Sequence, residues 1–208
     1  MIIRCDHCRL QKELCLCGEF PRLDTRTRVV ILMHSQELKK PSNTARWAHM
    51  CLPNSEIRLR GEIGKPLDLD GLQSDDAETW MLHLSEESEL LTPELVKRTE
   101  KPIRLLVPDG TWGQASRLGS KLGKSMQARH VYLQSDAPTQ YRLRSEHHPD
   151  GMATLEAIAR ALGIIEGVMI RQKMEDLFRR LVERELFTRG QLPPAEVYGG
   201  IPKGVKRS

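Results

Sequence analysis

The stretch IRLLV at residues 103–107 runs directly into PDGTWGQA at residues 108–115. The first five residues are almost continuously apolar, which is typical of a buried strand. Ligands of open α/β sheets bind beyond the carboxyl ends of strands and beside helix N-termini. Asp109 lies at such a place, because a helix pattern begins at Thr111. Ordinary turn and cap chemistry is one interpretation. A carboxylate, a hydroxyl and the aromatic Trp112 within four residues favour a functional site instead.

Strand and helix patterns alternate on both sides of this stretch. The patterns predict strands at 28–33, 56–59, 79–84, 103–107 and 130–133, and helices at 42–52, 111–122, 154–162 and 169–187. Ser42 is the expected N-cap of the first of these helices, and Thr154 that of the third. The alternation favours an α/β fold with a mostly parallel sheet and helices on its faces.

The last predicted helix has an apolar stripe, formed by Met174, Leu177, Phe178, Leu181 and Val182. Such a stripe is more typical of a core contact or a subunit contact than of a functional motif. We expect a monomer. The final eight residues, IPKGVKRS, have the composition of a flexible basic end.

Four of the five cysteines lie within thirteen residues, as Cys5, Cys8, Cys15 and Cys17. Structural zinc binds four thiolates at about 2.3 Å, and two short cysteine-rich turns can present them. We therefore predict a small N-terminal zinc knuckle. A redox pair and an iron–sulfur cluster are alternatives, and His7 is a possible substitute ligand.

The composition excludes several classes of protein. The chain has 208 residues, 39% hydrophobic and 29% charged, which does not fit a disordered, collagenous or coiled-coil chain. No apolar run approaches the roughly 18 residues of a membrane helix. The beginning, MIIRCDHCRL, has polar residues and cysteines where a signal peptide has its apolar stretch. We expect a cytoplasmic protein with no membrane contact.

Charge is unevenly distributed along the chain. The total is +4, but the segment 61–95 holds ten acidic residues against the single basic Lys65, a local charge of −9. The remaining chain therefore carries +13. The acidic part, at 61–78, is predicted to be an exposed connection between strands. A basic body favours a polyanionic partner such as a nucleic acid, with a solvated surface as the alternative.

The four residues Asp109-Gly110-Thr111-Trp112 are the D-x-T-W signature of the DTW-domain family, which the chain resembles over most of residues 4–167. The family's other landmarks occur in order: the cysteine quartet, His34 and Glu37 followed by Ser42-Asn43-Thr44, then Tyr141-Arg142-Leu143-Arg144, and Ala153-Thr154-Leu155-Glu156-Ala157. Ser42, Gln140 and Ala153 depart from the pattern, which affects single hydrogen bonds only.

The resemblance implies a tRNA-uridine aminocarboxypropyltransferase. Such an enzyme moves the 3-amino-3-carboxypropyl group of S-adenosylmethionine to N3 of a uridine in tRNA, giving acp3U and 5′-methylthioadenosine. It also implies a SPOUT-like fold with a C-terminal trefoil knot. We accordingly expect a zinc-binding segment at residues 1–22, a DTW catalytic domain at 23–167, and a C-terminal helix with a basic tail at 168–208.

The catalytic candidates are the three named residues of the signature. Asp109 could accept the N3 proton of uridine or orient the imide. Thr111 and Trp112 complete this set. Trp112 could stack on a base or face the sulfonium, with burial in the core as the alternative.

Other matched residues are candidates for binding. The donor's carboxylate calls for Arg142 or Arg144, and its ammonium for Glu37 or Glu156. The remaining cofactor-binding candidates are Leu106, Val107, Pro108, Tyr141, Leu143 and Thr154. The substrate-binding candidates are His34, Glu37, Ser42, Asn43 and Thr44.

Two other classes of function are consistent with these features. A SPOUT-type RNA methyltransferase would use the same cofactor and fold. A non-catalytic, zinc-dependent RNA-binding module would explain the cysteines and the charge, but it would leave the Asp109 cluster without a role.

Overall fold

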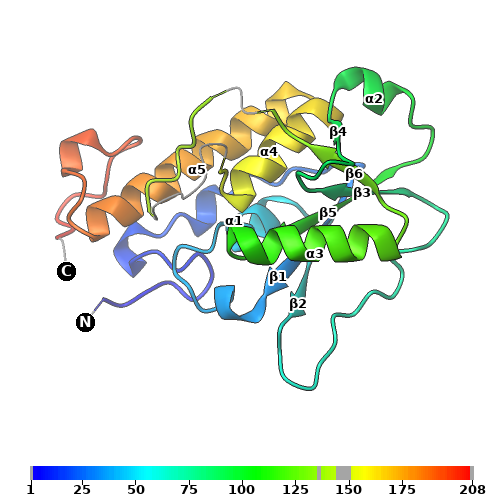
Figure 1. Cartoon of the computed structure of the whole chain (residues 1–208). Helices are drawn as coiled ribbons and strands as arrows, with labels where there is room; N and C mark the ends of the chain where they lie inside the picture. Colours follow the sequence, from blue (N-terminus) through cyan, green and yellow to red (C-terminus); the bar gives the residue numbers. More distant parts are fainter. Residues whose placement is uncertain (1, 135–136, 144–150, 207–208) are drawn as a thin grey trace.

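In the computed structural model, which describes residues 2–134, 137–143 and 151–206, the described strands form one parallel six-stranded sheet. The strand order is β2-β1-β5-β3-β6-β4 (Figure 1). The bounds are β1 Arg28–His34, β2 Ser55–Arg60, β3 Glu78–Leu82, β4 Glu89–Leu90, β5 Ile103–Asp109 and β6 Arg129–Tyr132. The predicted parallel α/β sheet is confirmed, and the short edge strand β4 was not predicted.

Two strand ends differ by two residues from the predicted ones, and both lie near the site. The strand predicted at 103–107 continues for two residues, so that Asp109 is the last residue of β5. The strand predicted at 79–84 ends at Leu82, which leaves the next two side chains beyond the sheet.

Helices cover both faces of the sheet, as predicted. The bounds are α1 Thr44–Cys51, α2 Pro93–Lys97, α3 Trp112–Ser125, α4 Thr154–Ile165 and α5 Val168–Thr188. In β1, Val29, Ile31 and Met33 join a core with α1, α4 and α5. Val30 and Leu32 face the other way, into a smaller cluster with α3. Burial on two faces explains why the central strands are continuous apolar runs.

The N-cap of α1 is Asn43 and not the predicted Ser42. The Asn43 Oδ1 accepts a hydrogen bond of 2.7 Å from the backbone N–H of Arg46. Asparagine and serine serve equally well at this position, so propensity could not choose between two neighbours.

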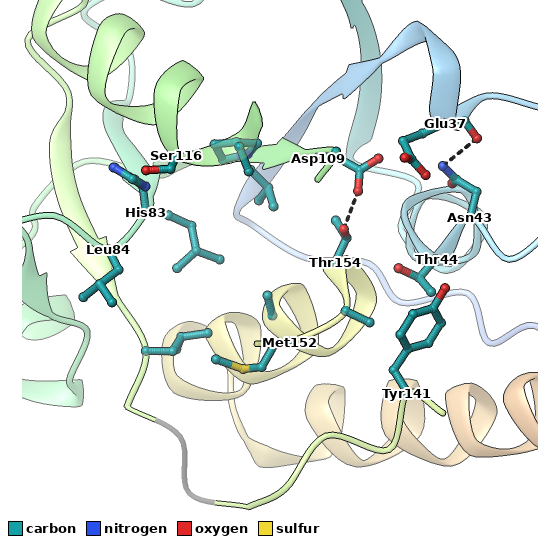
Figure 2. A pocket seen from close by; sticks show the side chains of 18 of the residues that line it. Glu37, Asn43, Thr44, His83, Leu84, Asp109, Ser116, Tyr141, Met152 and Thr154 are labelled. Carbon is teal, nitrogen blue, oxygen red and sulfur yellow. Dashed lines mark hydrogen bonds between the residues drawn. The ribbon is translucent and has the colours of Figure 1, made fainter. Parts of the chain in front are cut away.

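The prediction that Thr154 caps α4 is also wrong. The cap is Ala153, and the Glu156 carboxylate accepts from its backbone N–H at 3.0 Å, as in a capping box. The Thr154 hydroxyl donates instead to Oδ1 of Asp109 at the end of β5 (Figure 2). A helix terminus and a strand terminus are therefore joined at this point.

The apolar stripe of α5 is part of the core, one of the two contacts that we expected, because its five residues are all buried. Phe178 lies edge-on to Trp47 of α1, with ring centroids 6.5 Å apart, and stacks on Tyr141 at 6.1 Å. None of the described helices combines the length and the apolar character that crossing a membrane requires.

The N-terminal segment packs on α1 and α5. The Trp47 Nε1 donates to the carbonyl of Cys8 at 2.8 Å, and the Arg184 guanidinium donates to that of Leu14 at 2.9 Å. Arg4 pairs with the buried carboxylate of Glu185 at 2.9 Å. Buried charges are stable only with such partners, so these contacts fix the segment's position.

The C-terminal tail, up to residue 206, is not the loose end that its composition predicted. Ile201 and Val205 pack against the main core. The Gln11 side chain donates to the carbonyl of Lys206 at 3.4 Å, next to the N-terminal segment. Two apolar residues among the basic ones are sufficient to bind the tail to the body.

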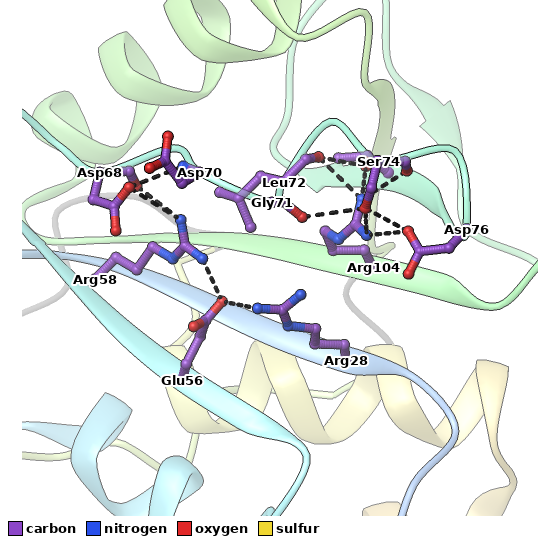
Figure 3. A network of polar contacts seen from close by, with 11 residues as sticks. Arg28, Glu56, Arg58, Asp68, Asp70, Gly71, Leu72, Ser74, Asp76 and Arg104 are labelled. Atoms are coloured by element: carbon purple, nitrogen blue, oxygen red, sulfur yellow. Dashed lines mark hydrogen bonds and ion pairs between the residues drawn. The ribbon is translucent and has the colours of Figure 1, made fainter.

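The connection between β2 and β3 is mostly exposed, as predicted, but one buried arginine anchors it. The Arg104 side chain, on β5, is only 1% exposed and donates to the carbonyl of Leu72 at 3.0 Å. It also bonds to Ser74 Oγ at 2.8 Å, Asp76 at 2.9 Å and Thr79 Oγ1 at 3.0 Å (Figure 3). An arginine inside an apolar strand thus supplies hydrogen-bond donors to backbone carbonyl groups of an acidic loop.

Replacement of Arg104 by Ala should destabilise the protein by roughly 2–4 kcal/mol, because buried carbonyl groups lose a charged donor. Urea unfolding measures this loss. Asp76→Asn is the matched control. Its carboxylate is 74% exposed, so the variant should lose much less stability. Equal losses in both variants would show that the ion pair, and not the carbonyl contacts, anchors the loop.

Candidate active site

A pocket lies beyond the carboxyl ends of β3, β5 and β6, where the N-termini of α1 and α4 close it (Figure 2). This is the place where α/β sheets bind ligands. The lining residues are Glu37, Ser42, Asn43, Thr44, Leu82, His83, Leu84, Val107, Pro108, Asp109, Gly110, Ala115, Ser116, Tyr132, Leu133, Tyr141, Met152, Ala153, Thr154 and Ala157.

One end of the pocket is polar. Asp109, 6% exposed, contributes a carboxylate that Thr154 orients, and Glu37, 4% exposed, contributes a second one. The Asn43 amide donates to the carbonyl of Glu37 at 3.1 Å. The Thr44 Oγ1 accepts from the backbone N–H of Leu155, in the first turn of α4, at 3.5 Å. Two helix N-termini, each with a partial positive charge, therefore meet two carboxylates.

The other end is largely apolar, with Leu84, Leu133 and Met152 among its walls. His83 and Ser116 add polar groups there (Figure 2). The pocket can therefore hold a ligand that has a charged head and a flat, weakly polar body.

The Nε2 atom of His83 lies 3.1 Å from the Oγ atom of Ser120. The ring centroid of His83 is 6.0 Å from that of His130. Burial, and then the nearby His130, lowers the pKa of His83. The ring is therefore more readily neutral than a free histidine, and it can offer one donor and one acceptor.

Several predicted binding residues do not line this pocket. Leu106 faces the opposite side of the sheet, in the cluster beside α3. Leu143 is buried in the main core. The Arg142 side chain is 53% exposed and pairs with Glu183 at 3.3 Å. His34 accepts at Nδ1 from its own 3₁₀ turn.

Glu156 also lies outside the lining, because its carboxylate binds backbone. Besides Ala153, it accepts from the N–H of Gln140 at 2.7 Å and from the hydroxyl of Thr139. It positions the segment that precedes α4. Arg144 lies outside the described residues.

The three named residues of the signature are placed differently. Asp109 enters the pocket, whereas Thr111 is exposed and its Oγ1 accepts from the N–H of Gln114 at 3.4 Å at the start of α3. Trp112 is the first residue of α3, and its side chain lies outside the described part of the structure. The sequence interpretation missed His83, Ser116, Tyr132 and Met152, because only the packing of β3, β6, α3 and the residues before α4 brings them into one pocket with Asp109.

The four clustered cysteines come together in an arrangement that could hold a metal ion. Their Sγ atoms all lie within 4.8 Å of one another, and three of the separations are 3.5, 3.6 and 3.8 Å. A tetrahedron with metal–sulfur bonds of about 2.3 Å has sulfur separations of about 3.8 Å. A disulfide needs about 2.05 Å, so the arrangement fits a metal ion and not a pair of bridges.

A family profile for the DTW domain matches residues 2–186. The chain belongs to the DTW-domain family. Its curated relatives include proteins named tRNA-uridine aminocarboxypropyltransferase 2. The one from Macaca fascicularis is 26% identical over 173 residues, which cover 78% of this chain and 56% of the relative. The one from Mus musculus is 25% identical over 167 residues, with the same coverage.

The relative from Drosophila melanogaster is 26% identical over 170 residues, which cover 78% of this chain and 66% of its own length. The DTW chain therefore spans about half to two thirds of the relatives that it matches. No solved structure matches it.

Within this DTW domain, the second residue of the signature must be small. Gly110 has φ +153°, and an added Cβ would lie 2.8 Å from Oε1 of Gln114 and 3.2 Å from Nη2 of Arg60. The Gln114 oxygen accepts from the N–H of Thr111 at 3.0 Å, so it cannot move without loss of that bond. Glycine is the residue that tolerates this conformation.

We predict that the double variant Cys8→Ser, Cys17→Ser loses its bound metal and part of its stability, because metal binding contributes directly to folding. Elemental analysis and thermal melting measure the two losses. Cys51→Ser is the control, since burial raises the pKa of the Cys51 thiol to about 12 and the side chain is outside the cluster. A wild-type protein purified without any metal would contradict the prediction.

Proposed function

We propose that this protein transfers the 3-amino-3-carboxypropyl group of S-adenosylmethionine to N3 of a uridine in tRNA, giving acp3U and 5′-methylthioadenosine. The observation that carries the proposal is the Asp109 carboxylate, held by Thr154 at the polar end of the pocket. The names of the curated relatives support the same reaction class.

The pocket suits the donor's two ends. The ammonium of the amino acid arm can bind Glu37, and its carboxylate can bind the N-termini of α1 and α4. The adenosine can lie among the apolar walls, with polar contacts from His83 and Ser116. The sulfonium has three carbons open to attack, so placement of the arm decides which group is transferred.

Asp109 is the residue that we assign to proton removal. Uridine N3–H is a weak acid and must lose its proton as N3 attacks. A carboxylate within hydrogen-bond reach can accept that proton, and the Thr154 hydroxyl fixes the carboxylate's direction. The electron pair of N3 then forms the new bond to the γ-carbon. The carbon–sulfur bond breaks, and sulfur leaves with its pair as a neutral thioether.

The metal site, the domain division and the topology complete the proposal. We assign structural zinc to the four thiolates, since a closed four-cysteine site leaves no open position for chemistry. The zinc-binding segment is 1–22, the catalytic domain 23–167 and the C-terminal part 168–208. The SPOUT-like topology with a trefoil knot belongs to the same proposal, and the parallel sheet supports it.

The proposed reaction predicts two products in equal amounts. Incubation of the purified protein with S-adenosylmethionine and unmodified tRNA, followed by mass spectrometry of the nucleosides, should show acp-modified uridine and 5′-methylthioadenosine. Methylated uridine with S-adenosylhomocysteine would indicate a methyltransferase. Absence of both products, together with absence of donor binding in calorimetry, would indicate a binding module and refute the proposal.

Asp109→Asn should keep the fold, because asparagine has the same size and keeps an oxygen for the Thr154 hydroxyl. Turnover at saturation should fall by at least about two orders of magnitude, since a general base is lost. Steady-state kinetics, donor calorimetry and thermal melting check this. The exposed Asp70→Asn is the control. Wild-type turnover in the Asp109 variant would leave this residue without a catalytic role.

A further inference from the structure

Arg60, the last residue of β2, lies beside the proposed catalytic residue. Its Nη2 is 3.5 Å from the carbonyl of Asp109, which is the hydrogen bond that the guanidinium makes within the described residues. Its Nε is buried without a hydrogen-bond partner there, and no ion pair involves it in that part of the chain. A guanidinium has five N–H donors, so most of the donors of Arg60 have no partner among the described residues.

The neighbouring arginines of this sheet are different. Arg58, two residues earlier on β2, pairs with Glu56 at 3.1 Å and with Asp68 at 3.8 Å (Figure 3). Arg28, on β1, pairs with Glu56 at 2.8 Å. Arg60 is half-buried, and burial lowers the pKa of its guanidinium while the Asp109 carboxylate opposes that shift. A partly desolvated cation with so few partners is costly unless an anionic group binds it during function.

The position of Arg60 separates it from the donor site. The Asp109 carboxylate points to Thr154, on the α4 side of the sheet. The Arg60 guanidinium reaches the same strand end next to Gly110, and Arg60 is absent from the described lining of the pocket. Asp109 therefore contacts the donor pocket through its carboxylate and Arg60 through its backbone carbonyl. An acceptor base that binds beside Asp109 would meet both groups.

We propose that Arg60 binds a carbonyl oxygen of the acceptor uracil and stabilises the negative charge that appears when N3 loses its proton. The inference rests on the proposed function. The N3–H electron pair stays on the ring while the proton goes to Asp109, so the charge is shared by N3, O2 and O4. N3 then attacks the γ-carbon, the carbon–sulfur bond breaks, and the charge on the base is neutralised.

The choice of a uracil oxygen over a tRNA phosphate follows from distance along the nucleotide. O2 and O4 are bonded to the two carbons that flank N3. A base whose N3 reaches the Asp109 carboxylate can therefore present one of these oxygens to Arg60, because that guanidinium contacts the backbone of the same residue. The phosphates are separated from N3 by the ribose and the ring. The charge-assisted bond to oxygen is also strongest where water is partly excluded.

The test compares Arg60→Gln with wild type, with Arg58→Gln as the control that removes a charge from the same strand. At saturating donor and tRNA, the Arg60 variant should lose about 10²–10³-fold in kcat, the effect of removing one oxyanion donor. Its KM for tRNA and its donor affinity should change little. The control should keep wild-type kcat.

A second substrate isolates the charge effect. Fluorine at C5 makes the N3–H of uracil more acidic, so tRNA containing 5-fluorouridine needs less help from the guanidinium. On this tRNA the deficit of Arg60→Gln should shrink by at least about tenfold, because a more acidic group depends less on catalysis of its ionisation. Arg60→Lys keeps the charge, so its kcat should lie between those of wild type and Arg60→Gln. This variant also keeps the inference testable if the glutamine variant misfolds.

Three results would overturn the inference. The first is an unchanged kcat in Arg60→Gln. The second is a loss of tRNA affinity with a weaker salt dependence and normal kcat, which would make Arg60 a phosphate contact. The third is an equal deficit on both tRNAs, which would make it a positioning residue only. A wild-type protein that forms no modified uridine would overturn the proposed function and this role together, and so differs from all three.

Discussion

All strands described in the sheet run in one direction, and this single constraint determines where chemistry can occur. Parallel strands place their carboxyl ends at a common edge, so side chains from β3, β5 and β6 meet although they are far apart in sequence. Helices that return over the sheet bring their N-termini to the same edge. The bond between Thr154 and Asp109 is the contact that joins the two sets.

A chain of contacts connects the cysteine cluster to this edge. The carbonyl of Cys8 accepts from Trp47, Trp47 contacts Phe178, and Phe178 stacks on Tyr141. The Tyr141 hydroxyl donates to the carbonyl of Ser42 at 3.0 Å, in the wall of the pocket. The cysteine segment therefore supports the binding site through packed aromatic rings and contributes no side chain to it.

Much of this arrangement could be predicted from the sequence, and the omissions have physical causes. Alternating patterns identified the long strands and helices, and Asp109 was placed at a strand end because a buried run stops there. The cap of α1 was assigned one residue too early, because serine and asparagine serve similar roles at helix starts. The cap of α4 was assigned one residue too late, because threonine is a favoured cap and the alanine before it is not. Strand β4 has two residues, too few for any periodicity to register.

The roles of two arginines could not be predicted for a different reason. Arg104 lies in an apolar run, and Arg60 ends a strand in which polar and apolar residues alternate. Their partners are set by strand order, which pairs β1 with both β2 and β5. Local sequence carries no information about that order, so the contact between Arg60 and Asp109 appears only in three dimensions.

The contact between Leu14 and Arg184 joins residues 170 positions apart, and it affects how the protein is made. At translation rates of about 5–20 residues per second, the cysteine segment emerges roughly 10–30 s before the α5 helix on which it packs. During that interval only contacts local in sequence can form. The four thiols, which span thirteen positions, can capture a metal ion at once. Metal capture on the ribosome would then fold this segment in advance and keep its thiols from other reactions until the rest of the chain arrives.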